Sequence, residues 1–150
     1  MAYPALLGPQ INVPINAASV TATAVSAQFS LGLGDCYQLL LSIGTVTGTS
    51  PTLDVVLTTS YDKGTNYVAL PIRWTQKTAS TTTEMITFRC GIGNNEVATA
   101  NVTAGTGGQL AKNCIFDPKY LKLSYTVAGT SPVFPVTLIA FVIPRGAAER

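Results

Sequence analysis

The feature that most constrains the fold is a series of short apolar segments, because no part of the chain sustains the periodicity of an amphipathic helix. Residues 20–25, 84–90 and 120–127 alternate along the chain, as a half-buried strand requires. Residues 37–43 (YQLLLSI) form a continuous apolar run, which is typical of a central strand buried on both faces. The pattern therefore predicts strands throughout.

About eight or nine such strands, separated by Gly, Pro and Asp turn signals, predict an all-β fold, an antiparallel β-sandwich or jelly roll. The 21 threonines and the many valines support this, because β-branched side chains fit a pleated surface. We expect a tight turn at residues 62–64 and a polar loop at residues 77–83. The longest strand is expected at residues 133–143 and a weaker one at residues 96–103. Residues 110–114 alone have a short helical pattern.

An apolar segment with a proline every five residues precedes the strands. Each proline fixes φ and favours an extended residue before it, and a disordered tail would be more polar. We therefore expect an extended N-terminal arm over residues 1–18, a sandwich domain over residues 19–143 and a short C-terminal tail over residues 144–150. The arm is expected to lie on its own domain or on a neighbouring subunit. Its candidate contact residues are Tyr3, Leu6, Leu7, Ile11, Val13 and Ile15.

Composition argues against several partners and activities. Charged residues are 11% of the 150 residues, with a formal net charge of +2. No Lys/Arg cluster is present to neutralise phosphates, so we expect no nucleic-acid partner. The apolar stretches fall short of the roughly 20 residues of a membrane-spanning helix, and a basic signal-peptide region is missing. The chain has no histidine, the commonest general base and metal ligand.

Neither the acidic nor the basic residues form a recognisable catalytic pattern. The carboxylates are spread singly, whereas a glycosidase needs two facing one bond. We therefore interpret them as solvated turn and strand-face residues, and the lysines as a solubilising set. The protein is expected to have no catalytic, cofactor-binding or metal-binding residues and not to be an enzyme. The acidic residues are Asp35, Asp54, Asp62, Glu84, Glu96, Asp117 and Glu149; the lysines are Lys63, Lys77, Lys112, Lys119 and Lys122.

The three cysteines, Cys36, Cys90 and Cys114, are an odd number and are widely spaced. They lack the C-x-x-C spacing or partner histidine of a zinc site. Two states stay open: three reduced thiols, or one disulfide and one free thiol. The first favours assembly in a reducing cytoplasm.

Aromatic residues allow two interpretations. Trp74, Tyr61, Tyr67 and Phe88 could form a sugar-stacking platform, or they could pack in the core or at a subunit interface. Trp74 follows Arg73, so we expect it to be partly exposed and to contact a partner.

One internal repeat is visible. Residues 45–57 read TVTGTSPTLDVVL and residues 126–138 read TVAGTSPVFPVTL. Glycine and Ser-Pro are turn residues, so we interpret both copies as a repeated hairpin connection between strands. Pro135 stands where the first copy has Asp54, which predicts an edge or a bulge at that point.

These turn and strand motifs resemble those of small virion proteins of tailed phages. The resemblance covers residues 37–141 and rests on Gly-Thr-Ser-Pro-Thr-Leu-Asp-Val, on a Ser-Tyr-Asp-Lys-Gly turn, and on the Tyr-Leu-Lys-Leu-Ser that begins at Tyr120. Such proteins include head decoration (cement) proteins, and related sandwiches occur in neck and tail parts.

The resemblance implies a particular role and location. A decoration protein stabilises the capsid by binding across subunits of the major capsid protein, and such proteins commonly form homo-oligomers, here expected to be trimers. The protein would then lie on the capsid surface of the virion after assembly in the host cytoplasm. The alternatives are a neck or tail component, or a carbohydrate-binding or adhesion module.

Overall fold

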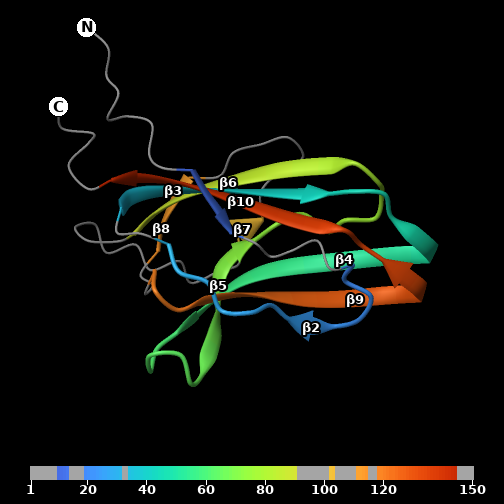
Figure 1. The fold of residues 1–150 in the computed structure, drawn as a ribbon, viewed down its shortest axis with the longest axis horizontal. Helices are drawn as coiled ribbons and strands as arrows, with labels where there is room; N and C mark the ends of the chain where they lie inside the picture. The colour runs from blue at the N-terminus through green and yellow to red at the C-terminus, as the bar shows by residue number, and fades with distance from the viewer. Residues whose placement is uncertain are drawn as a thin grey trace, which may run out of the picture.

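A computed structural model describes residues 10–13, 19–31, 34–90, 102–103, 111–114 and 118–144. Within these ranges the chain forms strands and no helix, and the strands build two sheets that lie one on the other (Figure 1). The all-β prediction is therefore confirmed, and the arrangement is that of a β-sandwich.

The first sheet has the strand order β1-β10-β3-β6-β8. Its long central strands β10, β3 and β6 pair antiparallel, as does β1 with β10, whereas the edge strand β8 pairs parallel with β6. The strands are β1 (Gln10–Val13), β10 (Val136–Pro144), β3 (Gly34–Ile43), β6 (Thr82–Cys90) and β8 (Ala111–Cys114).

The second sheet has the order β2-β9-β4-β5-β7. Strands β2, β9, β4 and β5 pair antiparallel, and the two-residue strand β7 adds in parallel to β5. Both parallel pairings depart from the predicted antiparallel sandwich, and both involve edge strands. The strands are β2 (Ala24–Val25), β9 (Leu121–Val133), β4 (Thr47–Ser60), β5 (Tyr67–Arg73) and β7 (Val102–Thr103).

One hydrophobic core lies between the sheets, and residues at alternate positions of both sheets supply it. Leu39 and Leu41 of β3, Leu53 and Leu57 of β4 and Leu138 of β10 are fully buried. Burial of apolar surface contributes about 25 cal/mol per Å², so this shared core holds the two sheets together.

The structure corrects three expectations about the strands. Residues 111–114 form strand β8 rather than a helical turn. The longest strand is β4, with 14 residues, and residues 133–143 are divided at Pro135 between the end of β9 and the start of β10. In β3 only one face is fully buried, since Gln38, Leu40 and Ser42 are half-buried on the other face.

The N-terminal segment is described only at residues 10–13, where β1 pairs with β10 of the same chain. Ile11 lies opposite Ala140 and Val13 opposite Leu138. The other predicted arm contacts, Tyr3, Leu6, Leu7 and Ile15, lie outside the described residues, as do residues 145–150 of the predicted tail.

The repeated Gly-Thr-Ser-Pro motif does not form hairpin connections. Both copies lie inside the long antiparallel pair of β4 and β9, with Thr49 opposite Thr130. The ladder shifts register on either side of this pair, because each motif contains two residues with positive φ. These are Gly48 (114°) with Ser50 (49°), and Gly129 (112°) with Ser131 (48°).

The turn between β4 and β5 is built by two side chains. The Ser60 hydroxyl accepts the backbone N–H of Gly64 at 2.7 Å and donates to Asp62 Oδ1 at 2.9 Å. Asp62 Oδ1 also accepts the backbone N–H of Asn66 at 2.6 Å and that of Thr65 at 3.1 Å. These bonds confirm the predicted turn and hold the pKa of Asp62 below its ordinary value of 3.8, the Asn66 backbone bond being the largest cause.

This turn predicts an acid dependence of stability. Because the pKa of Asp62 is lowered by folding, its contribution is fully present above the unfolded value of 3.8 and is lost as the pH falls through the folded value. We expect Asp62→Asn to reduce the acid-induced loss of stability relative to the unmodified protein. Urea unfolding at several values between about pH 5 and about pH 2 measures this difference. Parallel pH profiles of the two proteins would contradict it.

Candidate functional site

A buried ion pair joins Lys77 to Glu84 where the chain crosses from the second sheet to the first. Lys77 is 6% exposed and Glu84 3% exposed. A charge buried to this degree is destabilising unless it is paired and hydrogen-bonded. The pair is therefore the most distinctive chemical feature of the described residues.

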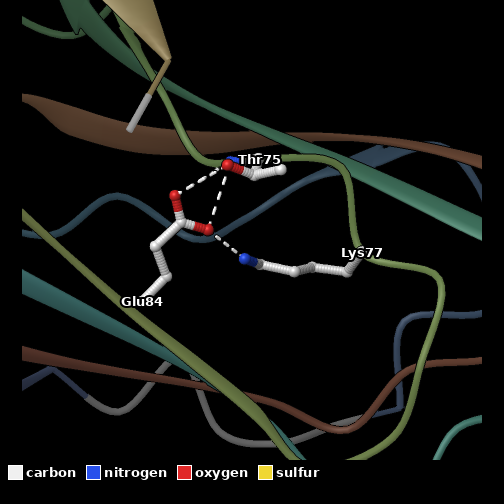
Figure 2. A network of polar contacts seen from close by, with 3 residues as sticks. All are labelled: Thr75, Lys77 and Glu84. Atoms are coloured by element: carbon white, nitrogen blue, oxygen red, sulfur yellow. Dashed lines mark hydrogen bonds and ion pairs between the residues drawn. The ribbon is translucent and has the colours of Figure 1, made fainter. Parts of the chain in front are cut away.

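Thr75 completes the network, as Figure 2 shows. Its hydroxyl donates to Glu84 Oε1 at 3.0 Å, and its backbone N–H points at both carboxylate oxygens at 3.2 Å. Lys77 Nζ donates to Glu84 Oε2. The carboxylate thus accepts bonds from three donors on two residues, which locks its orientation.

Backbone bonds hold the crossover segment in place. Trp74 N–H donates to the Val55 carbonyl at 3.1 Å, and Lys77 exchanges two backbone bonds with Leu53, at 2.8 and 2.9 Å. Further along, Thr81 N–H donates to the carbonyl of Gly44 at 3.0 Å. The segment is therefore attached to β4 at one end and to the end of β3 at the other, and Glu84 of β6 fixes its middle.

A pocket of about 360 Å³ opens beside this network. Its wall combines the ion pair with hydroxyl, amide and methyl groups, so it offers donors, acceptors and small apolar surfaces together. The lining residues are Thr75, Gln76, Lys77, Thr78, Ala79, Thr82, Thr83 and Glu84. Gln76 is held at the outer surface by a 2.9 Å bond from its side-chain amide to Asp54 Oδ2.

The geometry of the network suits it to hold the local structure in place. Both oxygens of Glu84 and the ammonium of Lys77 are engaged with each other and with Thr75. The network can therefore orient the pocket wall and fix the crossover.

Sequence reasoning missed this site. Lys77 was predicted to be a solubilising lysine and Glu84 a solvated carboxylate; both predictions are wrong, since both side chains are buried. One signal could have found Glu84: the alternation in residues 84–90 puts it on the same face as Ile86, which is fully buried. Nothing comparable marks Lys77, whose burial depends on the crossover.

The expectation that Trp74 is a partly exposed contact residue is also wrong. Its side chain is 1% exposed and lies in the core, while its backbone N–H donates to the Val55 carbonyl of β4. Within the described residues its indole N–H has no hydrogen-bond partner. Tyr61 is 69% exposed, whereas Tyr67 donates to Gln28 Oε1 at 2.7 Å and lies under Lys122 Nζ, 4.2 Å from its ring centre. A sugar-stacking platform centred on Trp74 is therefore not formed.

The strand register brings two of the three cysteines together. Cys90 in β6 lies opposite Cys114 in β8. Neighbouring strands are about 4.8 Å apart, which is within the Cα separation of disulfides, so a single disulfide with Cys36 left over remains one of the two open states. Among the residues that the structure describes, no group of three or more potential metal ligands occurs.

In the described part of the chain, no helix has the length and apolarity that a membrane crossing requires. A scan of protein-family models, a search of curated proteins and a search of solved structures each found no match to this chain.

Proposed function

We propose that the protein is a non-enzymatic structural component of a phage virion, a head decoration protein that binds across subunits of the major capsid protein. The observation that carries the proposal is the strand order. Strands β1-β10-β3-β6 in one sheet and β2-β9-β4-β5 in the other interleave the two halves of the chain. This order supports a jelly roll, a fold of viral capsid and lectin domains. The motif resemblance to tailed-phage virion proteins points the same way.

The Lys77–Glu84 network adds a physical reason for a structural role. It ties the crossover between sheets to β6 through bonds that are all internal to the domain. The domain would then be rigid, and a rigid binding partner loses little conformational entropy on binding. Such a rigid domain, expected to form a trimer on the capsid surface, would stabilise the capsid by burying apolar surface against its subunits.

Two other roles use the same fold. A neck or tail component would also need a rigid sandwich, and the number of copies per particle separates it from a decoration protein. A carbohydrate-binding module would need exposed aromatic rings. The burial of Trp74 and the hydrogen bond of Tyr67 to Gln28 count against that role.

The contact residues proposed on the N-terminal arm can be tested by two deletions. Removing residues 1–9 leaves β1 in place, whereas removing residues 1–18 also removes the strand that pairs with β10. We expect the shorter deletion to keep the melting temperature and to weaken binding to purified particles by about tenfold or more, a change of about 1.4 kcal/mol. The longer deletion should in addition lower the melting temperature.

Binding to stripped particles, measured by sedimentation over a range of protein concentrations, provides the comparison. Unchanged binding after removal of residues 1–9 would show that Tyr3, Leu6 and Leu7 are not contact residues. The melting temperature of each deletion, measured on the free protein, separates a lost contact from a damaged fold.

A further inference from the structure

Eight of the ten described strands form two successive sets of four that repeat each other. The first set contains β1, β2, β3 and β4, and we name it copy 1 (residues 10–60). The second contains β5, β6, β9 and β10, and we name it copy 2 (residues 67–144). The first sheet alternates β1, β10, β3 and β6, and the second alternates β5, β4, β9 and β2. If each strand is replaced by its counterpart in the other copy (β1 by β5, β2 by β6, β3 by β9 and β4 by β10, and the reverse), the order of the first sheet becomes that of the second.

The register of the outer strands obeys the same exchange. In the first sheet Gln10 lies opposite Phe141, Ile11 opposite Ala140 and Asn12 opposite Ile139. In the second sheet Tyr67 lies opposite Ser60, Val68 opposite Thr59 and Ala69 opposite Thr58. Both triplets run in the same direction without a gap, so β1 corresponds to β5 and β10 corresponds to β4 residue by residue.

The segments that connect β1 to β2 and β5 to β6 follow the same exchange of copies. Val20 exchanges two backbone bonds with Phe134, as Lys77 does with Leu53. Phe134 and Leu53 are equivalent positions of the repeat at residues 45–57 and 126–138.

Three residues after each of these bridges, a hydroxyl makes the same pair of bonds. Thr23 Oγ1 accepts the N–H of Val127 at 3.1 Å and donates to its carbonyl at 3.5 Å. Ser80 Oγ accepts the N–H of Val46 at 2.8 Å and donates to its carbonyl at 3.4 Å. Val46 and Val127 are again equivalent positions of the repeat.

The pseudo-two-fold axis that relates the two copies passes between Thr49 and Thr130, which are equivalent and lie opposite each other. A Cβ on Gly48 would lie 2.8 Å from the carbonyl oxygen of Ser131, and a Cβ on Gly129 would lie 2.8 Å from that of Ser50. Each glycine therefore lets its own strand approach the Ser-Pro of the other copy.

A two-fold relation can follow from the way strands wrap in a sandwich, but such wrapping does not require the same side chains at equivalent positions. Here the Thr-Val and Gly-Thr-Ser-Pro of both copies coincide. In the sequence, Thr21-Ala22-Thr23 also aligns with Thr78-Ala79-Ser80, and Val13-Pro14-Ile15 with Leu70-Pro71-Ile72; two residues of each triplet are identical and the third is similar. We infer that the chain is a tandem duplication of one four-stranded unit, joined by the turn at residues 61–66. Strands β7 and β8 belong to a segment that copy 2 alone contains, between β6 and β9.

The duplication implies that the four-stranded unit on its own would pair with a second copy of itself. Among the eight strands of the repeat, every pair of neighbours in a sheet comes from different copies, so one unit alone has no complete sheet and no closed core. The present chain is thus a dimer joined into one polypeptide. The Lys77–Glu84 pair belongs to copy 2 only, since Val20 stands at the position of Lys77 and Ser26 at that of Glu84. Ser26 bonds to Leu123 of β9, as the counterpart of Glu84 opposite Leu41 of β3.

Matched substitutions in the full chain test the duplication. We expect Gly48→Ala and Gly129→Ala to lower the melting temperature by the same amount, roughly 5–10 °C each and within about 3 °C of one another. A large loss for one and none for the other would overturn the inference.

If a glycine variant fails to fold, Thr23→Ala and Ser80→Ala provide the second comparison. Each removes one hydroxyl that bonds the backbone of the other copy, so losses of about 2–4 °C that agree within error are expected. A loss for Ser80→Ala with no loss for Thr23→Ala, or the reverse, would overturn the equivalence of the crossovers. Thermal unfolding followed by circular dichroism measures all four variants.

Discussion

Replacing Glu84 by alanine is expected to lower the free energy of unfolding by about 3–5 kcal/mol. The change leaves the Lys77 ammonium buried without its counter-charge, and it removes the bonds from Thr75 to the carboxylate. An uncompensated buried charge is among the most destabilising defects that one substitution can create. Urea unfolding at neutral pH measures the loss.

The matched control removes both charges at once. In Lys77→Met with Glu84→Leu, side chains of similar length fill the space and no charge is left unpaired. We expect this double variant to lose clearly less free energy of unfolding than Glu84→Ala, because only the bonds from Thr75 are lost and no buried charge is left unpaired. A loss below about 1 kcal/mol for Glu84→Ala would contradict the burial of the pair, because exposed ion pairs contribute about that much or less.

Trp74→Ala is expected to cost about 3–5 kcal/mol, because it removes the largest fully buried side chain of the core and leaves a cavity. The side chain lies in the hydrophobic core, and the backbone N–H of Trp74, directly after β5, donates to the Val55 carbonyl of β4. A small effect on unfolding would show that the indole is exposed in solution.

Trp74→Phe provides the control for this position. Phenylalanine keeps most of the ring contacts and removes an indole N–H that has no partner within the described residues. We therefore expect a much smaller loss than for alanine. If phenylalanine were as damaging as alanine, a hydrogen bond from the indole would have to be important for stability.

The periodicity of the sequence predicted the long strands because such a strand buries one face and leaves the other more exposed, which produces alternation along the chain. The alternation of β9, with Leu121, Leu123 and Tyr125 inside and Lys122 and Ser124 half-buried, follows the predicted pattern. Such local patterns carry no information about which strands become neighbours. The parallel edge strands β7 and β8 and the interleaved order were therefore not predictable from them.

The site was less predictable than the fold because its members come from different elements. Glu84 lies on β6, while Thr75 and Lys77 lie on the crossover, which looks like a polar loop in the sequence. The interpretation of the Gly-Thr-Ser-Pro repeat as a hairpin was wrong for a related reason. Each motif has turn residues, but their positive φ values serve the close approach of β4 and β9.

The proposed place of the protein on a capsid is tested most directly by counting its copies in purified particles. Quantitative mass spectrometry, with labelled peptides of this chain and of the major capsid protein, gives the ratio. The proposal predicts one copy per capsid subunit, or a simple fraction of that number. A handful of copies per particle would place the protein in the neck or tail, and its absence from particles would contradict a virion role.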